Sequence, residues 1–337
     1  MTSQPCITEN EAELCFPQLN TSCMKPKHPL SETVSIYIVL SSISLFTAVL
    51  NLLVIISISH FKQLHSPTNL LILSLAISDF FVSFLLMFQI MLIDGCWYLG
   101  DTMCLLYCVL SYIISFSSVG TMVLISVDRY VAICDPLHYS TKVTSERVQI
   151  CVSVCWFISL FYLIVQIKDN LNQPGRYNSC IGECVIVLNL TERLTDLIST
   201  FIIPITVIIV LYMRVFVVAV SQARAMRSHI AAVTLKSSVS AKKSELKAAR
   251  TLGVVIVVFL LCICPYFCTT LIGELTLLNT SSAGFVICLV YFNSCLNPII
   301  YALFYPWFRK SIKLVITLQI LKPGSINADQ SYERRTV

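Results

Sequence analysis

Long apolar stretches alternate with short polar ones along most of the chain, and their lengths indicate helices that cross a membrane. The hydrocarbon layer of a bilayer is about 30 Å thick, and a helix needs roughly 20 apolar residues to span it. Stretches of that length occur at about 33–59, 68–93, 102–134, 147–168, 193–222, 248–274 and 283–305. The pattern predicts an all-α membrane protein, a seven-transmembrane helix bundle.

The same pattern divides the chain into four parts. We expect an amino-terminal segment at 1–32, the transmembrane domain at 33–305, a short amphipathic eighth helix at 306–317 and a polar tail at 318–337. Residues 1–32 contain no apolar region typical of a cleaved signal peptide, so the first span is expected to act as the targeting signal.

The distribution of basic residues predicts the orientation in the membrane. Of 23 Lys and Arg residues, five fall on the amino-terminal side of the predicted spans and 18 on the opposite side. The positive-inside rule therefore places the amino terminus outside the cell, in a multi-pass protein of the plasma membrane. Topology and anionic lipid account for the net charge of +5, so we expect membrane lipid and no nucleic acid as a partner.

Two features of the loops remain open from the residues alone. The basic, Ser-rich segment 224–247 is either a solvated linker or a docking face for a cytosolic partner. Seven of the sixteen cysteines lie on the predicted outer side, where disulfides can form, but the sequence does not give their connectivity. A metal site there is disfavoured, because no histidine or second cysteine pair completes four ligands. Glycosylation sequons on the outer side begin at Asn20, Asn189 and Asn279.

Two carboxylates lie between the outer and cytoplasmic ends of the predicted spans, Asp79 and Asp196, and Asp196 is one turn inside its span. A carboxylate at mid-membrane costs about 2.5 to 3.5 kcal/mol on insertion scales, so each needs a partner or a watery cavity. At 3.6 residues per turn, Asp196 is expected to share a helix face with Ser199, Thr200 and Ile203. Asp196 is read either as a functional group or as an interfacial acid near a helix start, favoured by the helix dipole.

Several motifs in order along the chain resemble those of a known family. They are LNLLV around Asn51, LSLAISD ending at Asp79, SVDRYVAICDPLHY from Ser126 and NSCLNPIIYALFYPWF from Asn293. Together with Trp156, Pro204 and Pro265, they resemble the rhodopsin-like G protein-coupled receptors over about residues 30 to 315. The last motif, with HFKQLHSPTN at 60–69 and DGCWYLGD at 94–101, resembles the trace amine-associated receptors.

The resemblance implies a cytoplasmic switch and a set of disulfides. The switch that engages a heterotrimeric G protein would comprise Asp128, Arg129, Tyr130, Asn297, Pro298 and Tyr301; the alternative for Arg129 is a charge that only snorkels to the interface. The implied bridges are Cys104 with Cys184 and Cys23 with Cys180, leaving Cys6, Cys15 and Cys96 unassigned. No cysteine follows Phe308 to carry a palmitoyl anchor, so the eighth helix would be anchored by Trp307, Phe308, Ile312 and Ile316.

The chain departs from the family pattern at the position that usually holds the ligand ammonium. The usual Asp lies eighteen residues before the Arg of the DRY motif, and here that residue is Ser111. Asp196 resembles a counter-ion moved to the fifth helix, as in a subset of this family in fishes. The remaining pocket residues would be Ser111, Tyr112, Ser115, Thr200, Tyr266, Phe267 and Tyr291, although each aromatic taken singly fits core packing equally well.

Two further expectations follow from the resemblance. Asp79 would hold an allosteric sodium ion together with Ser118, Asn293 and Ser294, and no other cofactor is expected. Ile263 replaces the usual Trp two residues before Pro265, which leaves open how ligand efficacy is set and how active the receptor is without ligand.

The function expected is therefore an olfactory amine receptor that raises cyclic AMP through a stimulatory or olfactory-type G protein. The alternative is a receptor for a non-amine ligand, with Asp196 structural. An enzyme would need a nucleophile with a base or a metal cluster within the spans. A transporter would show paired halves with broken helices. A photoreceptor would need a lysine in 283–305 for its Schiff base; none of the three patterns is found.

Overall fold

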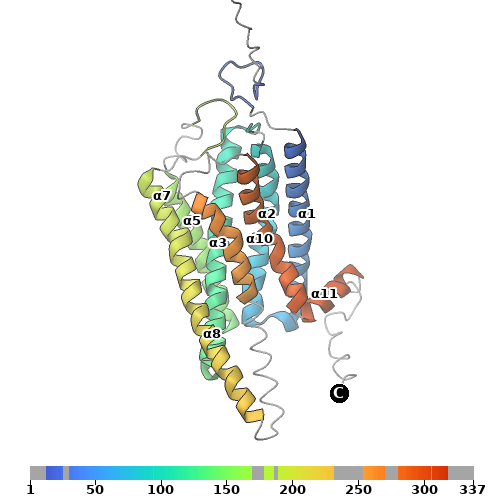
Figure 1. The fold of residues 1–337 in the computed structure, drawn as a ribbon, viewed down its shortest axis with the longest axis vertical. Helices are drawn as coiled ribbons and strands as arrows, with labels where there is room; N and C mark the ends of the chain where they lie inside the picture. Colours follow the sequence, from blue (N-terminus) through green and yellow to red (C-terminus); the bar gives the residue numbers. More distant parts are fainter. Residues whose placement is uncertain are drawn as a thin grey trace, which may run out of the picture.

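The fold is a bundle of long helices that run side by side, described here in a computed structural model (Figure 1). The structure describes residues 13–25, 30–93, 95–168, 178–185, 189–230, 253–269, 280–304 and 306–317. Within these ranges the β-type pairing consists of two isolated bridges, Leu14 with Met24 and Ser22 with Ile181. The predicted all-α class is confirmed.

The observed helices coincide with the predicted spans. The long ones are α1 (Leu30–His60), α2 (Pro67–Ile93), α3 (Gly100–Cys134), α5 (Ser145–Gln166), α8 (Ile203–Ile230) and α10 (Thr280–Phe304). The short helix α7 (Leu190–Leu197) and the π-helical turn η3 (Ile198–Ile202) run directly into α8 and complete the fifth span. Six helices are long and apolar enough to cross a membrane, and an apolar helix at Gly253–Thr269 occupies the described part of the predicted sixth span.

The connecting elements are short. The 3-10 turn η1 (Lys62–Leu64) lies between α1 and α2, and η2 (Pro136–His138) with the four-residue α4 (Tyr139–Lys142) joins α3 to α5. The helix α11 (Pro306–Ile316) follows α10 directly. Loops of this length force consecutive spans to run antiparallel, so the two ends of the bundle collect residues from all the helices.

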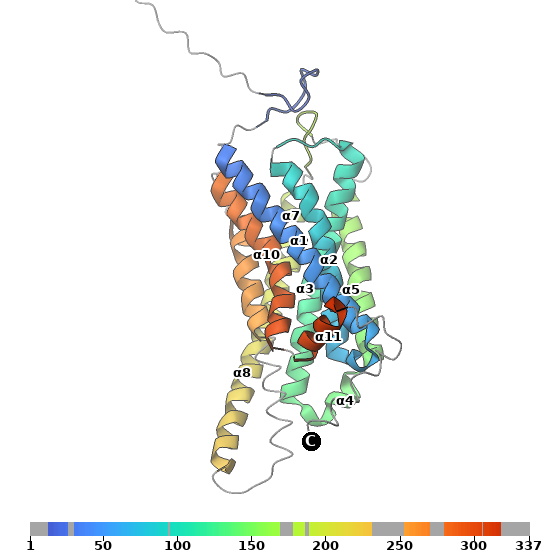
Figure 2. The same ribbon diagram turned by 90° about the vertical axis from the view of Figure 1, so that its right-hand side faces the viewer.

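Helix α3 is the centre of the bundle, in contact with α2, α5 and α8 (Figure 2). The main core cluster joins residues of several spans, among them Leu75, Ile125, Ile208, Phe259 and Tyr301. The side chains that point outward are apolar as well, with Phe157 and Phe161 each 71% exposed on α5. A surface of exposed apolar side chains on a helix with satisfied backbone is what lipid requires.

The fifth span is not a regular α-helix, which corrects one expectation. The π-helical turn η3 begins two residues after Asp196, and its i to i+5 hydrogen bonds take in more residues per turn than an α-helix does. Ser199 and Thr200 remain partly buried, as Asp196 is, whereas Ile203 is 55% exposed. The prediction that Ile203 shares the face of Asp196 is wrong, because the π turn rotates the residues that follow it.

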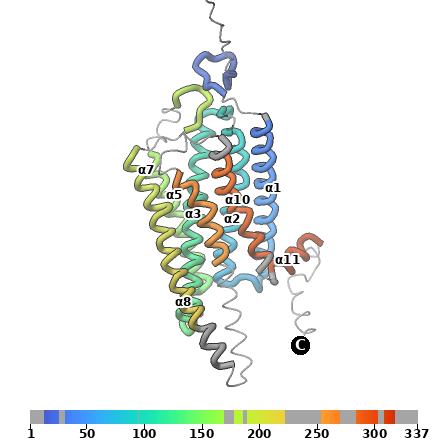
Figure 3. Tube along the Cα trace, viewed as in Figure 1, coloured from blue at the N-terminus to red at the C-terminus, as the bar shows by residue number. Residues whose placement is uncertain are grey.

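One end of the bundle, here called the N-terminal face, carries residues 13–25, 95–99 and 178–185, which lie together (Figure 3). Both expected disulfides are present, Cys104–Cys184 with the Cα atoms 5.5 Å apart and Cys23–Cys180 with the Cα atoms 5.0 Å apart. A third bridge joins Cys15 to Cys96. Two covalent links therefore fix the loop between Cys15 and Cys23 to both loops of this face.

The opposite end, here called the switch face, carries Asp128, Arg129 and α11. Phe308 of α11 is 1% exposed and packs edge-on against Tyr301, with the ring centroids 6.5 Å apart. Ile312 packs against the main core, and only Ile316 is exposed. Phe308 and Ile312 therefore hold α11 to the bundle rather than to lipid, which corrects their expected role; the side chain of Trp307 lies outside the described residues.

Candidate functional site

Asp196 lies in the last turn of α7, which begins with a complete capping box. The Asn189 side chain accepts a hydrogen bond from the Glu192 backbone N–H at 2.9 Å, and the Glu192 carboxylate accepts one from the Asn189 N–H at 2.8 Å. These bonds satisfy the free donors at the helix start without using Asp196. The reading of Asp196 as a mere helix-start acid is therefore weakened, because Asn189 and Glu192 already fill that role.

The Asp196 carboxylate is only partly satisfied by its neighbours. Its Oδ1 atom is buried and has no hydrogen-bond donor. Tyr162 of α5 hydrogen bonds to the carboxylate, while the Tyr162 hydroxyl oxygen accepts from Ser199 Oγ at 2.7 Å and Gln166 Nε2 at 2.6 Å. These polar groups hold Tyr162 in place beside Asp196, but Oδ1 of the carboxylate remains without a hydrogen-bond donor.

Two further phenol rings come from other helices. Tyr112 of α3 and Tyr266 of the sixth span both interact electrostatically with Asp196. Both are predicted pocket residues, and the structure places them within electrostatic range of Asp196. Within the described residues no basic side chain forms an ion pair with this carboxylate. A partly buried anion near several phenol groups, with no cationic partner among the described residues, is an environment that an ammonium ligand fits.

The other hydroxyls predicted for the pocket bond to their own helices. Ser111 Oγ donates to the Tyr107 carbonyl at 2.8 Å, and Thr200 Oγ1 donates to the Asp196 carbonyl at 2.6 Å. Ser115 is exposed. Such local bonds leave the hydroxyls as acceptors only, so they can orient a ligand N–H but cannot replace a counter-ion. Phe267 is stacked on Phe201 with the centroids 4.3 Å apart, which fixes the sixth span against the fifth.

Tyr291 belongs to a different cluster from Asp196. Its hydroxyl donates to Gln89 Oε1 at 3.4 Å, and the Tyr107 hydroxyl donates to the same oxygen at 2.7 Å. The sequence reasoning missed Gln89 and Tyr107, as it missed Tyr162 and Gln166. The signal was present, because each is a polar group inside an apolar span and so needs an internal partner.

Asp79 occupies a second polar centre, deep in the bundle. It is 1% exposed, and its Oδ2 accepts from Asn297 Nδ2 at 2.8 Å, while Oδ1 is buried without a donor. The side-chain oxygens of Asn293 and Asn297 are also buried without donors. The oxygen without a donor on this buried carboxylate fits a hard cation such as sodium. Ser294 also hydrogen bonds to the carboxylate, and Ser118 is only partly buried.

The Asp128–Arg129 pair at the switch face is fully engaged. Arg129 Nε donates to Asp128 Oδ2 at 3.0 Å, and Arg129 Nη2 donates to Thr68 Oγ1 at 2.6 Å. Thr68 in turn donates to Asp128 Oδ2 at 2.9 Å. Arg129 is 7% exposed, so the interpretation as a charge that only snorkels to the interface is wrong.

A tyrosine from the loop after α3 completes this cluster. The Tyr139 hydroxyl donates to Asp128 Oδ1 at 2.8 Å. Burial raises the pKa of Tyr139, and the negative charge of Asp128 raises it further, so the phenol stays protonated and able to donate. Asp135 of the same loop is partly exposed, and hydrogen bonds from Lys142 and then His138 hold its pKa below the usual range. The loop is thus pinned to α3 at Tyr139.

The other predicted switch residues lie nearby. Tyr130 packs with Ile133 and Val215, between α3 and α8. Pro298 lies inside α10, and Tyr301 is 1% exposed against Phe308. Asn297 instead donates a hydrogen bond to Asp79. The predicted switch residues of α10 are therefore divided, with Asn297 in the Asp79 centre and Tyr301 packed against Phe308 at the switch face.

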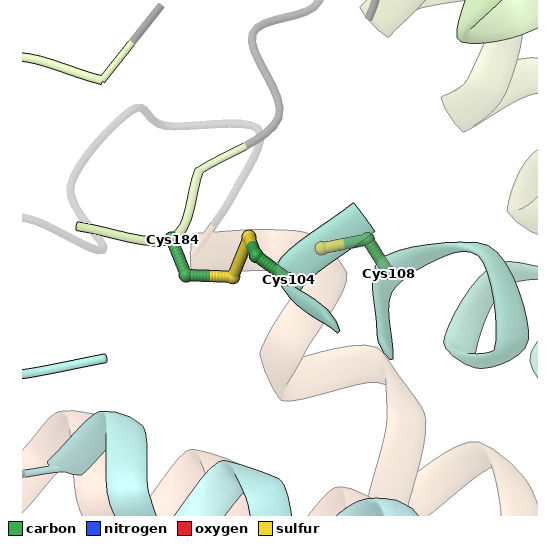
Figure 4. Close-up of side chains that lie close together, drawn as sticks. All are labelled: Cys104, Cys108 and Cys184. Carbon is green, nitrogen blue, oxygen red and sulfur yellow. A yellow bond between two sulfur atoms is a disulfide. The ribbon is translucent and has the colours of Figure 1, made fainter. Parts of the chain in front are cut away.

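Three cysteines gather at the N-terminal end of α3, and Figure 4 shows them side by side. The sulfur atoms of Cys104, Cys108 and Cys184 lie within 4.8 Å of one another. Two of these sulfurs are joined in a disulfide, and metals bind thiolates, so the cluster offers a single thiol as a ligand.

Among the sequons, Asn20 is exposed, Asn189 is the α7 cap, and Asn279 lies outside the described residues.

Comparison with known proteins establishes the class. The sequence pattern of the 7 transmembrane receptor family (rhodopsin family) matches residues 50–301, which include the Asp79 centre and the Asp128–Arg129 pair. Such a match across most of the bundle defines a rhodopsin-like G protein-coupled receptor, and it places the chain among receptors rather than enzymes.

Curated relatives narrow the family. Trace amine-associated receptor 13c of Danio rerio is 38% identical over 93% of this chain and 95% of its own length. Trace amine-associated receptor 8a of Rattus norvegicus is 40% identical over 96% and 98%, and trace amine-associated receptor 6 of Homo sapiens is 40% identical over 93% and 94%. The chain belongs to the trace amine-associated receptors.

Proposed function

We propose that this receptor binds amine ligands and that Asp196 is the counter-ion for the ligand ammonium. One observation carries the proposal: a partly buried carboxylate of the fifth span has a buried oxygen without a donor, three phenols that interact with it and no cationic partner among the described residues. The names of the relatives, which are called trace amine-associated receptors, support the ligand class.

The energetics favour a charged ligand over a neutral one. An alkylammonium resembles the lysine head group, with a pKa of about 10.4, and is charged at neutral pH. Pairing it with Asp196 offsets the cost of burying either charge alone, and removing one partner of a buried pair costs about 3 to 5 kcal/mol. Tyr162, Tyr112 and Tyr266 add ring faces and hydroxyl oxygens that a cation favours.

The ligand can act on signalling only by binding one conformation better than another. Asp196, Tyr162, Tyr112 and Tyr266 come from four different spans, so an ammonium held among them is sensitive to how these helices are spaced. We propose that this shift opens the Asp128–Arg129 cluster to a heterotrimeric G protein of the stimulatory or olfactory type, raising cyclic AMP. The N-terminal face would be extracellular, in the plasma membrane, as the distribution of basic residues indicates.

The Asp79 centre is proposed to bind sodium. Asp79 Oδ1 and the side-chain oxygens of Asn293 and Asn297 would hold the ion, with Ser118 and Ser294 nearby. The ion would supply positive charge to a buried carboxylate that otherwise has only neutral donors. Because these residues come from α2, α3 and α10, an ion at this centre would stabilise the spacing of these helices in one state.

The test is a cyclic-AMP screen in cells that express the wild-type receptor, followed by Asp196→Ala and Asp196→Glu. The probes are 2-phenylethylamine, trimethylamine, cadaverine and spermine, with 2-phenylethanol as a neutral control. We expect at least one amine to activate and the alcohol to be inactive. Asp196→Ala should lower potency about a hundredfold or more, since about 1.4 kcal/mol is a factor of ten, and Asp196→Glu should keep part of the response.

Surface expression must be measured alongside, and the structure predicts that it persists, because Asp196 makes few bonds that the fold needs. A variant Asp196→Ala that reaches the surface and answers its best amine with unchanged potency would show that the carboxylate is structural. The receptor would then be assigned a non-amine ligand.

A further inference from the structure

Gln166 is a polar side chain at the end of α5 that has no hydrogen bond to Asp196 itself. It is 8% exposed and is the last residue of a helix whose outward side chains are apolar. A buried amide in an apolar span needs internal partners. Those partners are Tyr162, one turn earlier on α5, and the backbone of Glu192 in α7. Gln166 therefore links α5 to the helix that carries Asp196.

The two partners fix the orientation of the Gln166 amide group. The Glu192 backbone carbonyl lies 3.3 Å from Gln166 Nε2, and a carbonyl can only accept, so the NH2 group faces it. The same NH2 group donates its second hydrogen to the Tyr162 hydroxyl oxygen at 2.6 Å. Toward Tyr162, Gln166 is thus a donor and not an acceptor.

The Tyr162 hydroxyl is fixed from several sides. Its ring is stacked on Phe116 of α3 with the centroids 5.1 Å apart, and its oxygen accepts from Ser199 Oγ at 2.7 Å as well as from Gln166. A phenol oxygen has two lone pairs, so two donors leave its own hydrogen for an acceptor. Tyr162 hydrogen bonds to the Asp196 carboxylate, which can only accept. The Tyr162 hydrogen is therefore directed to Asp196.

This chain of donors leaves the Asp196 carboxylate in a defined state. The carboxylate has a bond from Tyr162, while its Oδ1 atom is buried without a donor. A side chain that is already ordered by its neighbours costs a ligand less free energy to bind than one that the ligand must order. Holding a binding group through a second layer of hydrogen bonds is a general way to obtain such order.

From this geometry we propose that Gln166 is a positioning residue of the amine site and that it acts on Asp196 through Tyr162. Gln166 turns the phenol so that its hydrogen goes to the carboxylate, and Oδ1 is kept for the ligand ammonium. The inference rests on the proposed amine function. It assigns a role to a residue that lies one hydrogen bond further from the ligand than Tyr162 does.

The first test asks whether Gln166 and Tyr162 act in one chain. The readout is the cyclic-AMP potency of the most potent of 2-phenylethylamine, trimethylamine, cadaverine and spermine, at matched surface expression. Tyr162→Phe should lower potency about tenfold, and Gln166→Met, which keeps the length but removes the donor, about three- to fivefold. Added to Tyr162→Phe, Gln166→Met should change potency less than twofold, because the hydroxyl through which it acts is gone.

Matched controls remove the same groups elsewhere. Tyr98 is an exposed phenol of the N-terminal face and Gln63 is an exposed amide of η1, so Tyr98→Phe and Gln63→Met should leave potency unchanged. Gln166→Met without effect in the wild type would show that Gln166 does not position the site. The same fold loss from Gln166→Met with and without the Tyr162 hydroxyl would show that it acts on the fold in general. Either result would overturn the proposal.

A second test needs no ligand. Receptor labelled with 13C at the hydroxyl-bearing ring carbon of tyrosine is purified in nanodiscs, and the NMR signal absent from Tyr162→Phe is assigned to Tyr162. Both Gln166→Met and Asp196→Ala should shift this signal, since one removes a donor to the phenol and the other removes its acceptor. Gln63→Met should leave it in place. A Tyr162 signal that does not respond to Asp196→Ala, or does not respond to Gln166→Met, would show that the chain of hydrogen bonds is absent.

The two tests separate this inference from the proposed function. If the Tyr162 signal responds as expected but none of the four amines activates the receptor, the amine function fails, while the ordering of Asp196 by Gln166 and Tyr162 stands. If an amine activates the receptor through Asp196 but Gln166→Met changes neither its potency nor the Tyr162 signal, the amine function stands and the role of Gln166 is wrong.

Discussion

The carboxylate of the buried Asp128 and that of the partly buried Asp196 have contrasting hydrogen-bonding environments. Asp128 receives bonds from Arg129, Thr68 and Tyr139, so both of its oxygens are used by the chain itself. Asp196 has Tyr162 as its partner and keeps one buried oxygen without a donor.

We call the Asp128 site the closed cluster, because its carboxylate is fully hydrogen bonded within the chain, and the Asp196 site the receptive site, because one of its oxygens has no donor. A charge whose partners all come from the same chain stabilises one arrangement of helices and must be broken for that arrangement to change. A carboxylate with an oxygen that lacks a donor is stabilised when a cation from solution binds to it. Asp79 lies between these extremes, with one oxygen bonded to Asn297 and one free.

The largest expected effect comes from breaking the closed cluster. Asp128→Ala leaves Arg129 buried without its anion, which costs about 3 to 5 kcal/mol for a buried pair. We expect a clear drop in the thermal unfolding temperature of the solubilised receptor. Asp196→Asn is the comparison, and it should leave the unfolding temperature unchanged or slightly higher, since it removes a partly buried charge that has no cationic partner among the described residues. Equal losses from the two variants would contradict the contrast between the sites.

Removing one donor from the closed cluster should have an intermediate effect. Tyr139→Phe deletes only the hydroxyl that bonds to Asp128, and hydrogen bonds to charged groups contribute about 1.5 to 3 kcal/mol. Its control is Tyr130→Phe, in the apolar contact with Ile133 and Val215. Thermal unfolding of the two variants should differ, with Tyr139→Phe the less stable; the reverse order would show that the loop is not pinned through Asp128.

Adding a carboxylate should extend the receptive site. Ser111→Asp places a second acid on α3, at the position where related receptors usually carry one. A diamine such as cadaverine could then pair both of its charges, and we expect its potency to rise about tenfold relative to 2-phenylethylamine, or about 1.4 kcal/mol. Ser111→Asn is the uncharged control. Cyclic-AMP dose–response curves in which both variants treat the two amines alike would show that residue 111 does not face the ligand.

The smallest expected effect concerns Asp79. If sodium binds one state better, replacing sodium by choline should shift agonist potency several-fold in the wild type, by the differential affinity of the ion for the two states. Asp79→Asn keeps the size of the side chain and the bond to Asn297 but removes the charge. Its potency should be the same in both salts. A wild type that ignores sodium, or an Asp79→Asn variant that still responds to it, would remove the ion from this centre.

The sequence by itself determined the features that depend only on neighbouring residues or on a sum over them. Span positions depend on the summed hydrophobicity of about twenty consecutive residues, and the predicted spans matched the described helices to within a few residues. The isolated acids Asp79 and Asp196 were visible as functional candidates for the same reason, since a charge in an apolar run must find a partner.

What the tertiary structure decided was pairing between residues far apart in the chain. Cys15 could not be matched to Cys96, 81 residues away, and nothing near Asp128 in the sequence pointed to Thr68. The π turn that removes Ile203 from the Asp196 face was not predicted from the sequence, in which the span at about 193–222 was expected to form a regular helix. Hydropathy is a sum over residues that are neighbours in the sequence, so it does not depend on the tertiary structure. Partner choice depends on which helix faces meet, and only packing sets that.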